Sequence, residues 1–590
     1  MKKTILIFGC IIVVSAKLLF SQTILPVGFS QDELLNMQRS DYKEPFYLPQ
    51  GITTPPAGPV RAMAQWEEVQ ALTITWTSYE DVLREIVRAA RLETQVYIIC
   101  GPDCSGSTDS NSVKSYLTGG GVPLSNVHYI YTSCNSVWAR DYSSNSVYMN
   151  DVDSLISVDW KYNRPQRTDD DTVCRSVTRK LNIPLYETTQ GGNKLVHTGG
   201  NYMSDGLGTA FSSKLILDEN STLTESQVDN IMQNFMGINR YIKMETLPYD
   251  GIHHIDMHMK LLNEETLLVG EYPSGVADGP QIEANLQYVL SNFNSVFGTP
   301  YKVIRIPQPP DQLYYNYYPD NYGNYLTYAN SVIINKTVLV PQYYEEYDTT
   351  AIRIWKDAMP GYTVTGINSN STISASGSLH CITHSIGVKD PLLIVHQNLP
   401  NTINTTIPYQ VNARIQHKSG IQSATLYYRT DITQPFSSVA MTCTSIPNNT
   451  WTGYIPAKPA GTRVYYYLKG TANSGKQQVR PMPAPLGTFV FDVLVYTSVN
   501  NSIGHTFSMK TAYPNPSHGI TCIPVVFDKN TEGTVKLFDM LGNNIALVYK
   551  GSMQEGEKNF FINTLDISAG AYLIMIETPE GRISQKLMIK

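Results

Sequence analysis

Short apolar runs alternate with amphipathic stretches from about residue 60 to residue 389. Residues 71–76 (ALTITW) and 95–100 (QVYIIC) are short and apolar and contain β-branched side chains, as buried strands do. Between them, residues 79–92 repeat apolar positions at the spacing of a helix with one buried face. Strand-like runs recur at residues 266–272, 301–307, 331–341 and 379–387. The pattern predicts an α/β domain over residues 60–389.

The helical pattern disappears after Pro391. Runs at residues 424–430 and 463–471 are separated by Pro, Asn and Gly, which predicts a β-sandwich of the immunoglobulin type over residues 390–495. A proline-rich break then leads to a last all-β unit over residues 509–590, with strands expected at 534–540, 559–564 and 571–579.

The N-terminal pattern is that of an exported protein. Two lysines precede an apolar run and then small and polar residues, so we expect residues 1–22 to be a signal peptide. A membrane anchor is the alternative, but the uninterrupted apolar run is shorter than the ~20 residues that a spanning helix needs. We expect no later transmembrane segment. Residues 23–59 show little periodicity and are expected to be a pro-segment or linker.

Composition limits the classes of function. The 590 residues are 42% hydrophobic and 16% charged, which fits several globular domains. A net charge of −6 without a basic stripe argues against nucleic acid as a partner.

Cysteine usage points to a free thiol. Loss of Cys10 with the signal peptide would leave seven of the eight cysteines, an odd number in an oxidising compartment. Cys100 and Cys104 are close enough in sequence for a local disulfide. A zinc site is the competing interpretation for these two, but no second Cys or His pair follows at a suitable spacing.

Cys381 is the best candidate nucleophile. It stands beside His380 and near His384 in a run with small residues. A thiol with an ordinary pKa of ~8.5 needs a nearby cation, a helix start or a cationic substrate to become a thiolate. The alternative is an inert buried cysteine, which describes most lone cysteines.

Two further segments could assist such a nucleophile. In residues 251–260, the alternation of a strand would place His254, Asp256 and His258 on one face, for proton transfer or for a metal ion. In residues 137–142, Asp141 could accept hydrogen bonds from a guanidinium group while Trp138 forms an aromatic wall. A structural ion pair between Arg140 and Asp141 beside a core tryptophan is the alternative.

Seven motifs occur in an order that resembles the guanidino-modifying penteins, specifically the Porphyromonas-type peptidylarginine deiminases and the agmatine deiminases. The resemblance spans residues 64–389 and consists of AQWEE (64–68), WARDY (138–142), WKYNRP (160–165), TGGNYMSDG (198–206), HIDMHMK (254–260), YANSVIINKTVLVP (328–341) and LHCITHSIG (379–387). It implies a five-bladed α/β propeller with the active site on its central axis.

The resemblance also implies roles for single residues. Cys381 would attack the guanidinium carbon and form a covalent thiouronium intermediate, and His254 would act as general acid and base. Asp141 and Asp256 would hold the guanidinium nitrogens, with Asn330 completing the site. Trp138 and Arg164 would contact the rest of the substrate. The implied mechanism needs no metal and no cofactor.

The segment that follows residue 162 departs from the family pattern. The peptidylarginine enzymes carry two arginines, one residue apart, that hold the carboxylate of a C-terminal arginine. Here Arg164 matches the first, Gln166 takes the second position, and Arg167 is displaced by one. Paired capture of a carboxylate is therefore in question. The following acidic run, Asp169 to Asp171, could hold a structural calcium ion or form a solvated turn.

Residues 509–590 resemble the C-terminal sorting domain of the type IX secretion system. The landmarks are Pro514, Asn515 and Pro516, followed at suitable intervals by Asp539, Gly542, Gly570 and Tyr572. The resemblance implies the type IX machinery as a partner and a secreted or cell-surface location.

The leading hypothesis is a secreted deiminase that converts arginine in a peptide or protein to citrulline and releases ammonia. An agmatine or free-arginine deiminase with export domains is the closest rival. A cysteine peptidase would use the same Cys and His but would need an oxyanion hole in place of paired carboxylates. From a different class, the chain could be a surface adhesin whose pentein domain is inactive.

Overall fold

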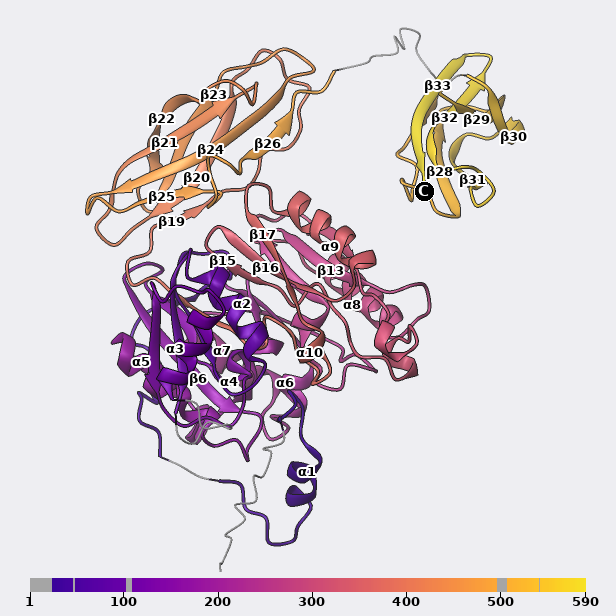
Figure 1. Cartoon of the computed structure of the whole chain (residues 1–590). Coiled ribbons are helices and arrows are strands. Elements are labelled where there is room, and N and C mark those ends of the chain that lie inside the picture. The colour runs from indigo at the N-terminus through magenta and orange to yellow at the C-terminus, as the bar shows by residue number, and fades with distance from the viewer. Residues whose placement is uncertain (1–23, 46–47, 102–108, 496–506, 541) are drawn as a thin grey trace, which may run out of the picture. The chain divides into compact units, whose positions relative to one another are not determined.

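The computed structural model describes residues 24–45, 48–101, 109–495, 507–540 and 542–590 (Figure 1). The signal peptide expected at residues 1–22 lies outside them. The chain separates into one compact unit that ends at Leu494 and another that begins at Val495.

Five small sheets occupy the described part of residues 60–389, and each repeats one pairing pattern. A strand pairs with one neighbour antiparallel and with another parallel. The sheets are β5 (Asn145–Met149), β6 (Ser154–Tyr162) and β7 (Leu185–Thr188); β9 (Met203–Ser204), β10 (Thr209–Ser213) and β11 (Arg240–Met244); β12 (Met259–Asn263), β13 (Thr266–Glu271) and β14 (Lys302–Pro307); β15 (Val332–Ile334), β16 (Thr337–Gln342) and β17 (Thr363–Asn368); and β18 (His384–Gly387), β2 (Val69–Thr75) and β3 (Gln95–Cys100). Strands β1 (Val60–Ala62), β4 (Val127–Tyr131) and β8 (Val196–His197) extend them.

Each parallel pair requires a crossover, and a helix provides it. The crossover helices are α2 (Glu80–Ala90), α3 (Ser110–Gly119), α5 (Val173–Leu181), α7 (Glu225–Met236), α8 (Gly279–Asn292) and α9 (Glu345–Ala358) (Figure 1). In α2 the buried residues include Val82, Ile86 and Ala90, four apart on one face. The helix predicted over residues 79–92 is therefore confirmed, as are the strands predicted at 71–76 and 95–100, within two residues at their ends.

One sheet joins the two ends of this region. Strand β18 pairs antiparallel with β2, and His384 lies opposite Thr73 although the two are far apart in the sequence. Strand β18, the last strand of the α/β region, thus completes the sheet that contains β2 and β3. This closure places the turn that precedes β18, with Cys381, against the beginning of the region.

The second part of the first unit is all β. Its strands are β19 (Leu393–Val395), β20 (Tyr409–Gln416), β21 (Ile421–Arg429), β22 (Ser437–Ser445), β23 (Thr450–Ile455), β24 (Arg463–Ala472), β25 (Gln477–Arg480) and β26 (Phe489–Asp492). Alternate side chains of β20, Val411, Ala413 and Ile415, enter a core shared with β24. The immunoglobulin-like assignment stays a prediction. Arg480 joins this part to the α/β part by an ion pair of 2.8 Å with Glu264.

The second unit contains β27 (Phe507–Met509), β28 (Ile520–Phe527), β29 (Thr531–Asp539), β30 (Asn544–Met553), β31 (Gly556–Asn563), β32 (Gly570–Thr578) and β33 (Gly581–Ile589). They form two antiparallel sheets over one apolar core. The remaining α-helices in the described part of the chain are the short α1 (Gln31–Met37), α4 (Ala139–Tyr142), α6 (Leu215–Asp218) and α10 (Asn370–Ile373). Among the described residues, no helix is both long and apolar enough to cross a membrane.

Several expectations from the sequence are wrong. His254 precedes a 3₁₀ turn, η4 (Ile255–Met257), and β12 begins only at Met259, so the histidine segment is not a strand. Of the strand expected at 379–387, only His384–Gly387 forms. Cys100 is a buried free thiol, so the local disulfide expected for it is wrong, and Cys104 lies outside the described residues. Helix α1 lies within residues 23–59, where the sequence showed little periodicity, and the interpretation of that stretch as a pro-segment or linker stays a prediction.

Candidate active site

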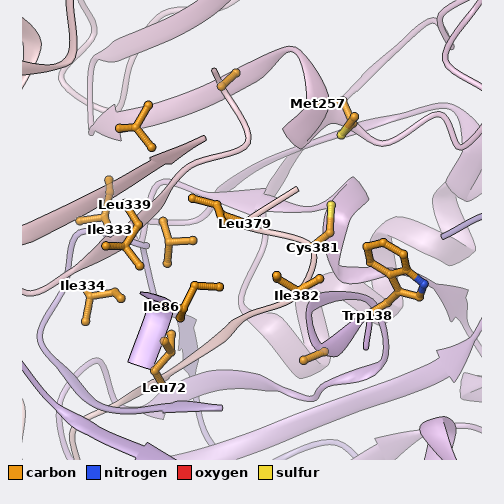
Figure 2. Packing of buried hydrophobic residues seen from close by; sticks show 14 of the residues in the cluster. Leu72, Ile86, Trp138, Met257, Ile333, Ile334, Leu339, Leu379, Cys381 and Ile382 are labelled. Atoms are coloured by element: carbon orange, nitrogen blue, oxygen red, sulfur yellow. The ribbon is translucent and has the colours of Figure 1, made fainter. Parts of the chain in front are cut away.

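Cys381 lies in the turn before β18, and its sulfur faces two side chains brought from other sheets. Asn330 donates from Nδ2 to Cys381 Sγ at 3.3 Å, and Asp256 Oδ2 lies 3.9 Å from the same sulfur. The turn is fixed on both sides, because Arg140 N donates to Cys381 O at 3.0 Å and His380 N donates to Asn330 Oδ1 at 3.0 Å. Figure 2 shows Cys381 beside the indole of Trp138 and below Met257.

Within the described part of the chain, Asp256 has a hydrogen-bond partner for only one of its two side-chain oxygens. Oδ2 lies 2.6 Å from Nδ1 of His380, whose Nε2 is 2.9 Å from Gln65 Nε2. Oδ1 has no hydrogen-bond partner among the described residues, although the side chain is fully buried. A buried acceptor without a partner is costly, so this oxygen is available for a donor on a ligand.

Asp141 and His254 form the other half of the site. Asp141 accepts from Gly200 N at 3.1 Å through Oδ1, and the same oxygen lies 3.6 Å from Nδ1 of His254. Neither ring nitrogen of His254 has a hydrogen-bond partner within the described residues. Asp141 lies in the short helix α4, and His254 directly precedes the 3₁₀ turn η4. A further 3₁₀ turn, η3 (Gly199–Asn201), contacts both elements.

The glycines of η3 make this approach possible. A Cβ on Gly200 would lie 2.4 Å from His254 Nδ1 and 2.9 Å from Asp141 Oδ1. A Cβ on Gly199 would lie 2.0 Å from the carbonyl oxygen of Arg140, which is main chain and cannot rotate away. The TGGN motif thus contains glycine because the backbone there contacts two catalytic candidates directly.

Burial dominates the electrostatics of the carboxyl groups. It raises the pKa of Asp141 to about 6 even though Arg164 favours the ionised form. Burial, and then the neighbouring charge of Asp141, raise the pKa of Asp256 well above its usual value, while Lys260 and Arg140 act against the shift. Two buried carboxyl groups that resist ionisation together would be charged more readily beside a bound cation.

Burial also disfavours the charged forms of the nucleophile and the histidine. Burial raises the pKa of the Cys381 thiol well above its usual value, and Asp256 and Asp141 add to the shift. Burial and the nearby charge of Arg164 lower the pKa of His254 well below its usual value. A planar cation between the carboxylates would favour the thiolate, so the site is electrostatically suited to a guanidinium group.

Trp138 and Arg164 lie at the edge of the site, where the N-terminal segment covers them. Trp138 Nε1 donates to the carbonyl oxygen of Leu25 at 2.8 Å. Arg164 donates from Nε to the carbonyl oxygen of Val27 at 3.0 Å. Arg167 is paired through Nε with Glu33 Oε1 at 2.8 Å. None of these contacts was foreseen from the sequence.

The acidic run is buried, so the solvated-turn interpretation is wrong for Asp170 and Asp171. Asp170 accepts from the backbone N–H of Asn135 and Ser136 at 2.7 and 3.0 Å, and Asp171 Oδ2 pairs with Lys161 Nζ at 2.5 Å. Protein donors therefore already contact both carboxylates. Among the described residues, no group of three His, Cys, Asp or Glu side chains is arranged to hold a metal ion. A structural calcium ion and a metal-free mechanism both stay predictions.

The structure brings together Cys381, His254, Asp141, Asp256 and Asn330 as the sequence motifs suggested, and it adds His380, Gln65 and Lys260. His380 was visible only as a neighbour of the nucleophile. Lys260 is fully buried, and burial lowers its pKa to about 7 while Asp256 acts in the opposite direction. In the sequence, only its position at the end of the HIDMHMK motif indicated that Lys260 could belong to the site.

This fold and site define a guanidino-modifying deiminase, a hydrolase that acts on carbon–nitrogen bonds. The chain belongs to the Porphyromonas-type peptidyl-arginine deiminase family, whose sequence model matches residues 61–386, more than half of the chain. Residues 511–590 match the secretion system C-terminal sorting domain. This domain indicates export through the type IX system, so the protein is secreted or held at the cell surface.

Individual relatives agree on the class of enzyme. A protein of Vibrio parahaemolyticus assigned as an agmatine deiminase is 25% identical over 375 residues, which cover 57% of this chain and 98% of that protein. A Legionella pneumophila protein with the same assignment is 24% identical over 265 residues, 44% of this chain and 75% of its own. An X-ray structure of a further protein assigned as an agmatine deiminase shares the fold, with a TM-score of 0.51, 19% identity, and coverage of 58% of this chain and 100% of that one.

Proposed function

We propose that the protein is an exported peptidylarginine deiminase that converts the guanidinium group of an arginine side chain to a ureido group and ammonia. The observation that carries the proposal is the convergence on Cys381 Sγ of Asn330 and of a buried aspartate with one free oxygen. Within the same proposal, the five repeated sheets are the blades of an α/β propeller, and the site lies on its axis.

In the proposed mechanism, Asp141 and Asp256 bind the guanidinium nitrogens and fix its plane across the Cys381 sulfur. His254 takes up the proton of the Cys381 thiol, and the resulting thiolate attacks the guanidinium carbon to form a tetrahedral adduct. His254 protonates one nitrogen, which leaves as ammonia, and a thiouronium linked to Cys381 remains. His254 then takes a proton from water, which attacks the same carbon. The carbon–sulfur bond breaks, and the ureido product and the thiol are released.

An agmatine deiminase is the second candidate. The relatives described above carry that assignment. In addition, Gln166 occupies the position of the second carboxylate-binding arginine and donates to the carbonyl oxygen of Glu33 at 2.7 Å. The export domain and Arg164 at the edge of the site support the peptide substrate, since an exported enzyme meets proteins and a cationic side chain repels the amine of agmatine.

A comparison of three substrates tests the proposal. Ureido product and ammonia are measured with wild type and Cys381→Ala on agmatine, free arginine and a peptide that ends in arginine. Cys443→Ser is the control, because Cys443 is an exposed free thiol of the β-rich part. We expect activity on the peptide that disappears in Cys381→Ala and persists in Cys443→Ser. Activity confined to agmatine would favour the second candidate, and the absence of ureido product from all three would contradict both.

A further inference from the structure

We propose that residues 24–44, called the covering segment below, inhibit the enzyme by closing the entrance to its active site, and that the ion pair between Glu33 and Arg167 holds them there. The inference rests on the proposed function, because it concerns regulation of the same site. It concerns the stretch that the sequence analysis left as a pro-segment or linker.

The main chain of the covering segment is hydrogen-bonded to residues at the edge of the site. Besides the bond from Trp138 to Leu25, Val27 N donates to the carbonyl oxygen of Ala375 at 3.0 Å, and the Val27 side chain is only 1% exposed. The fit is close, because a Cβ on Gly377 would lie 2.4 Å from the Trp138 ring and 2.7 Å from Val27. Trp138 is the side chain expected to contact substrate, and here the chain itself covers it.

Arg164 is occupied in the same way. Its Nε donates to Val27 O, and its guanidinium lies 4.5 Å from the centre of the Phe29 ring. The positive charge of Arg164 lowers the pKa of both Asp141 and His254, so the guanidinium group of Arg164 lies close to the catalytic groups. A peptide substrate that uses Arg164 would have to displace this contact.

Helix α1 is held by a carboxylate and not by an apolar face. Glu33 is its one buried residue, whereas Leu34 and Leu35 are 40% and 53% exposed. Glu33 pairs with Arg167 through both oxygens, at 2.8 and 2.9 Å, and Arg167 also donates to Gly28 O at 2.6 Å. A helix fixed by hydrophobic packing would bury its leucines, so the polarity of α1 identifies Glu33 as the anchor.

With the covering segment in place, the catalytic groups cannot be reached. Cys381, His254, Asp256 and Asn330 have no exposed surface, and Asp141 is 1% exposed. A peptide-linked arginine must therefore move the segment before its guanidinium can bind. The stretch from Gln38 to Asp41 is exposed, so cleavage there would turn a tethered inhibitor into a free peptide that dilutes away.

The test compares Glu33→Gln with Asp32→Asn in the full chain. Both substitutions remove one carboxylate from the same helix, but Asp32 is exposed and lies outside the pair with Arg167. Two readouts are taken: the alkylation rate of Cys381 by a small neutral reagent, followed by mass spectrometry of its peptide, and kcat/KM for an arginine peptide. The exposed thiol of Cys443 is the internal reference for the reagent.

We expect Glu33→Gln to raise both quantities by about tenfold or more, because the fraction of open enzyme rises when the anchor is lost, and Asp32→Asn to change neither. Equal rates in wild type and Glu33→Gln would overturn the inference, even if all forms made citrulline. Faster alkylation in Glu33→Gln without ureido product in any form would support the covering role and contradict the proposed function. The two failures are thus distinguishable.

Discussion

Gly200 controls the distance between two catalytic candidates. Its missing side chain leaves the room in which His254 Nδ1 and Asp141 Oδ1 approach to 3.6 Å. Reaction rates depend steeply on the positions of catalytic side chains. A substitution of Gly200 should therefore change kcat/KM more than it changes the free energy of unfolding.

We therefore expect Gly200→Ala to lower kcat/KM by roughly 100-fold, since the added methyl group would push the imidazole and the carboxylate apart. Gly192→Ala is the control, because among the described residues no atom lies within 4 Å of a Cβ built there. Steady-state kinetics on an arginine peptide measure the difference. Equal kcat/KM in the two variants would show that the η3 contact does not matter.

Asp141 should set the acid limit of activity. Burial raises its pKa to about 6. A raised pKa means that the folded protein binds this proton more tightly than the unfolded chain does, so below that pH the carboxyl is neutral and attracts a guanidinium weakly. We expect kcat/KM of wild type to fall as the pH decreases below about 6, and Asp141→Asn to be inactive throughout. A profile that stays flat between about pH 5 and pH 8 would contradict this assignment.

At the scale of elements, the site is assembled by turns at the ends of strands. Two asparagines flank β15 and differ in what they hold. Asn330 contacts the sulfur and His380 N, whereas Asn335 bonds through its side chain with both backbone groups of Val69, at 2.8 and 3.0 Å. The first orients the nucleophile, and the second joins two sheets.

The two substitutions should therefore separate activity from stability. We expect Asn330→Ala to reduce kcat/KM by roughly 100-fold, in the range reported for the loss of one polar group in an active site. Asn335→Ala should instead lower the free energy of unfolding by about 1 to 3 kcal/mol and leave kcat/KM unchanged. Denaturant unfolding and steady-state kinetics on the same samples give the comparison. A loss of activity in Asn335→Ala at a temperature where it stays folded would refute this division.

The sequence predicted α2, β2 and β3 well because local periodicity sets such elements. It placed Cys381, Asp256 and Asp141 together only through the ordered motifs. It could not show that Gln65 contacts His380 across 315 positions or that Glu33 contacts Arg167 across 134, because such contacts exist only after the sheets close. The sequence predicted a strand at η4 because polar residues alternate there. The same alternation occurs in this short 3₁₀ turn, so the pattern does not distinguish the two structures.

At the scale of the whole molecule, the chain combines a deiminase region with a β-rich part and a C-terminal sorting domain that indicates export. The sorting domain lies in a unit of its own from Val495 onward, with a separate apolar core. The chemistry, in contrast, depends on residues drawn from several sheets of the α/β region. This division explains how an enzyme whose relatives are assigned to agmatine could be directed to substrates outside the cell.

The covalent step is the most direct test of the whole account. The full chain is acid-quenched during turnover of an arginine peptide and then digested with a protease. The mass of the fragment that contains Cys381 is measured by mass spectrometry. We predict a fragment heavier by the substrate less ammonia, the thiouronium adduct, in wild type and none in Cys381→Ala, which should form no citrulline. Citrulline formation by Cys381→Ala at the wild-type rate, with Cys381 unmodified in the wild type, would contradict the account.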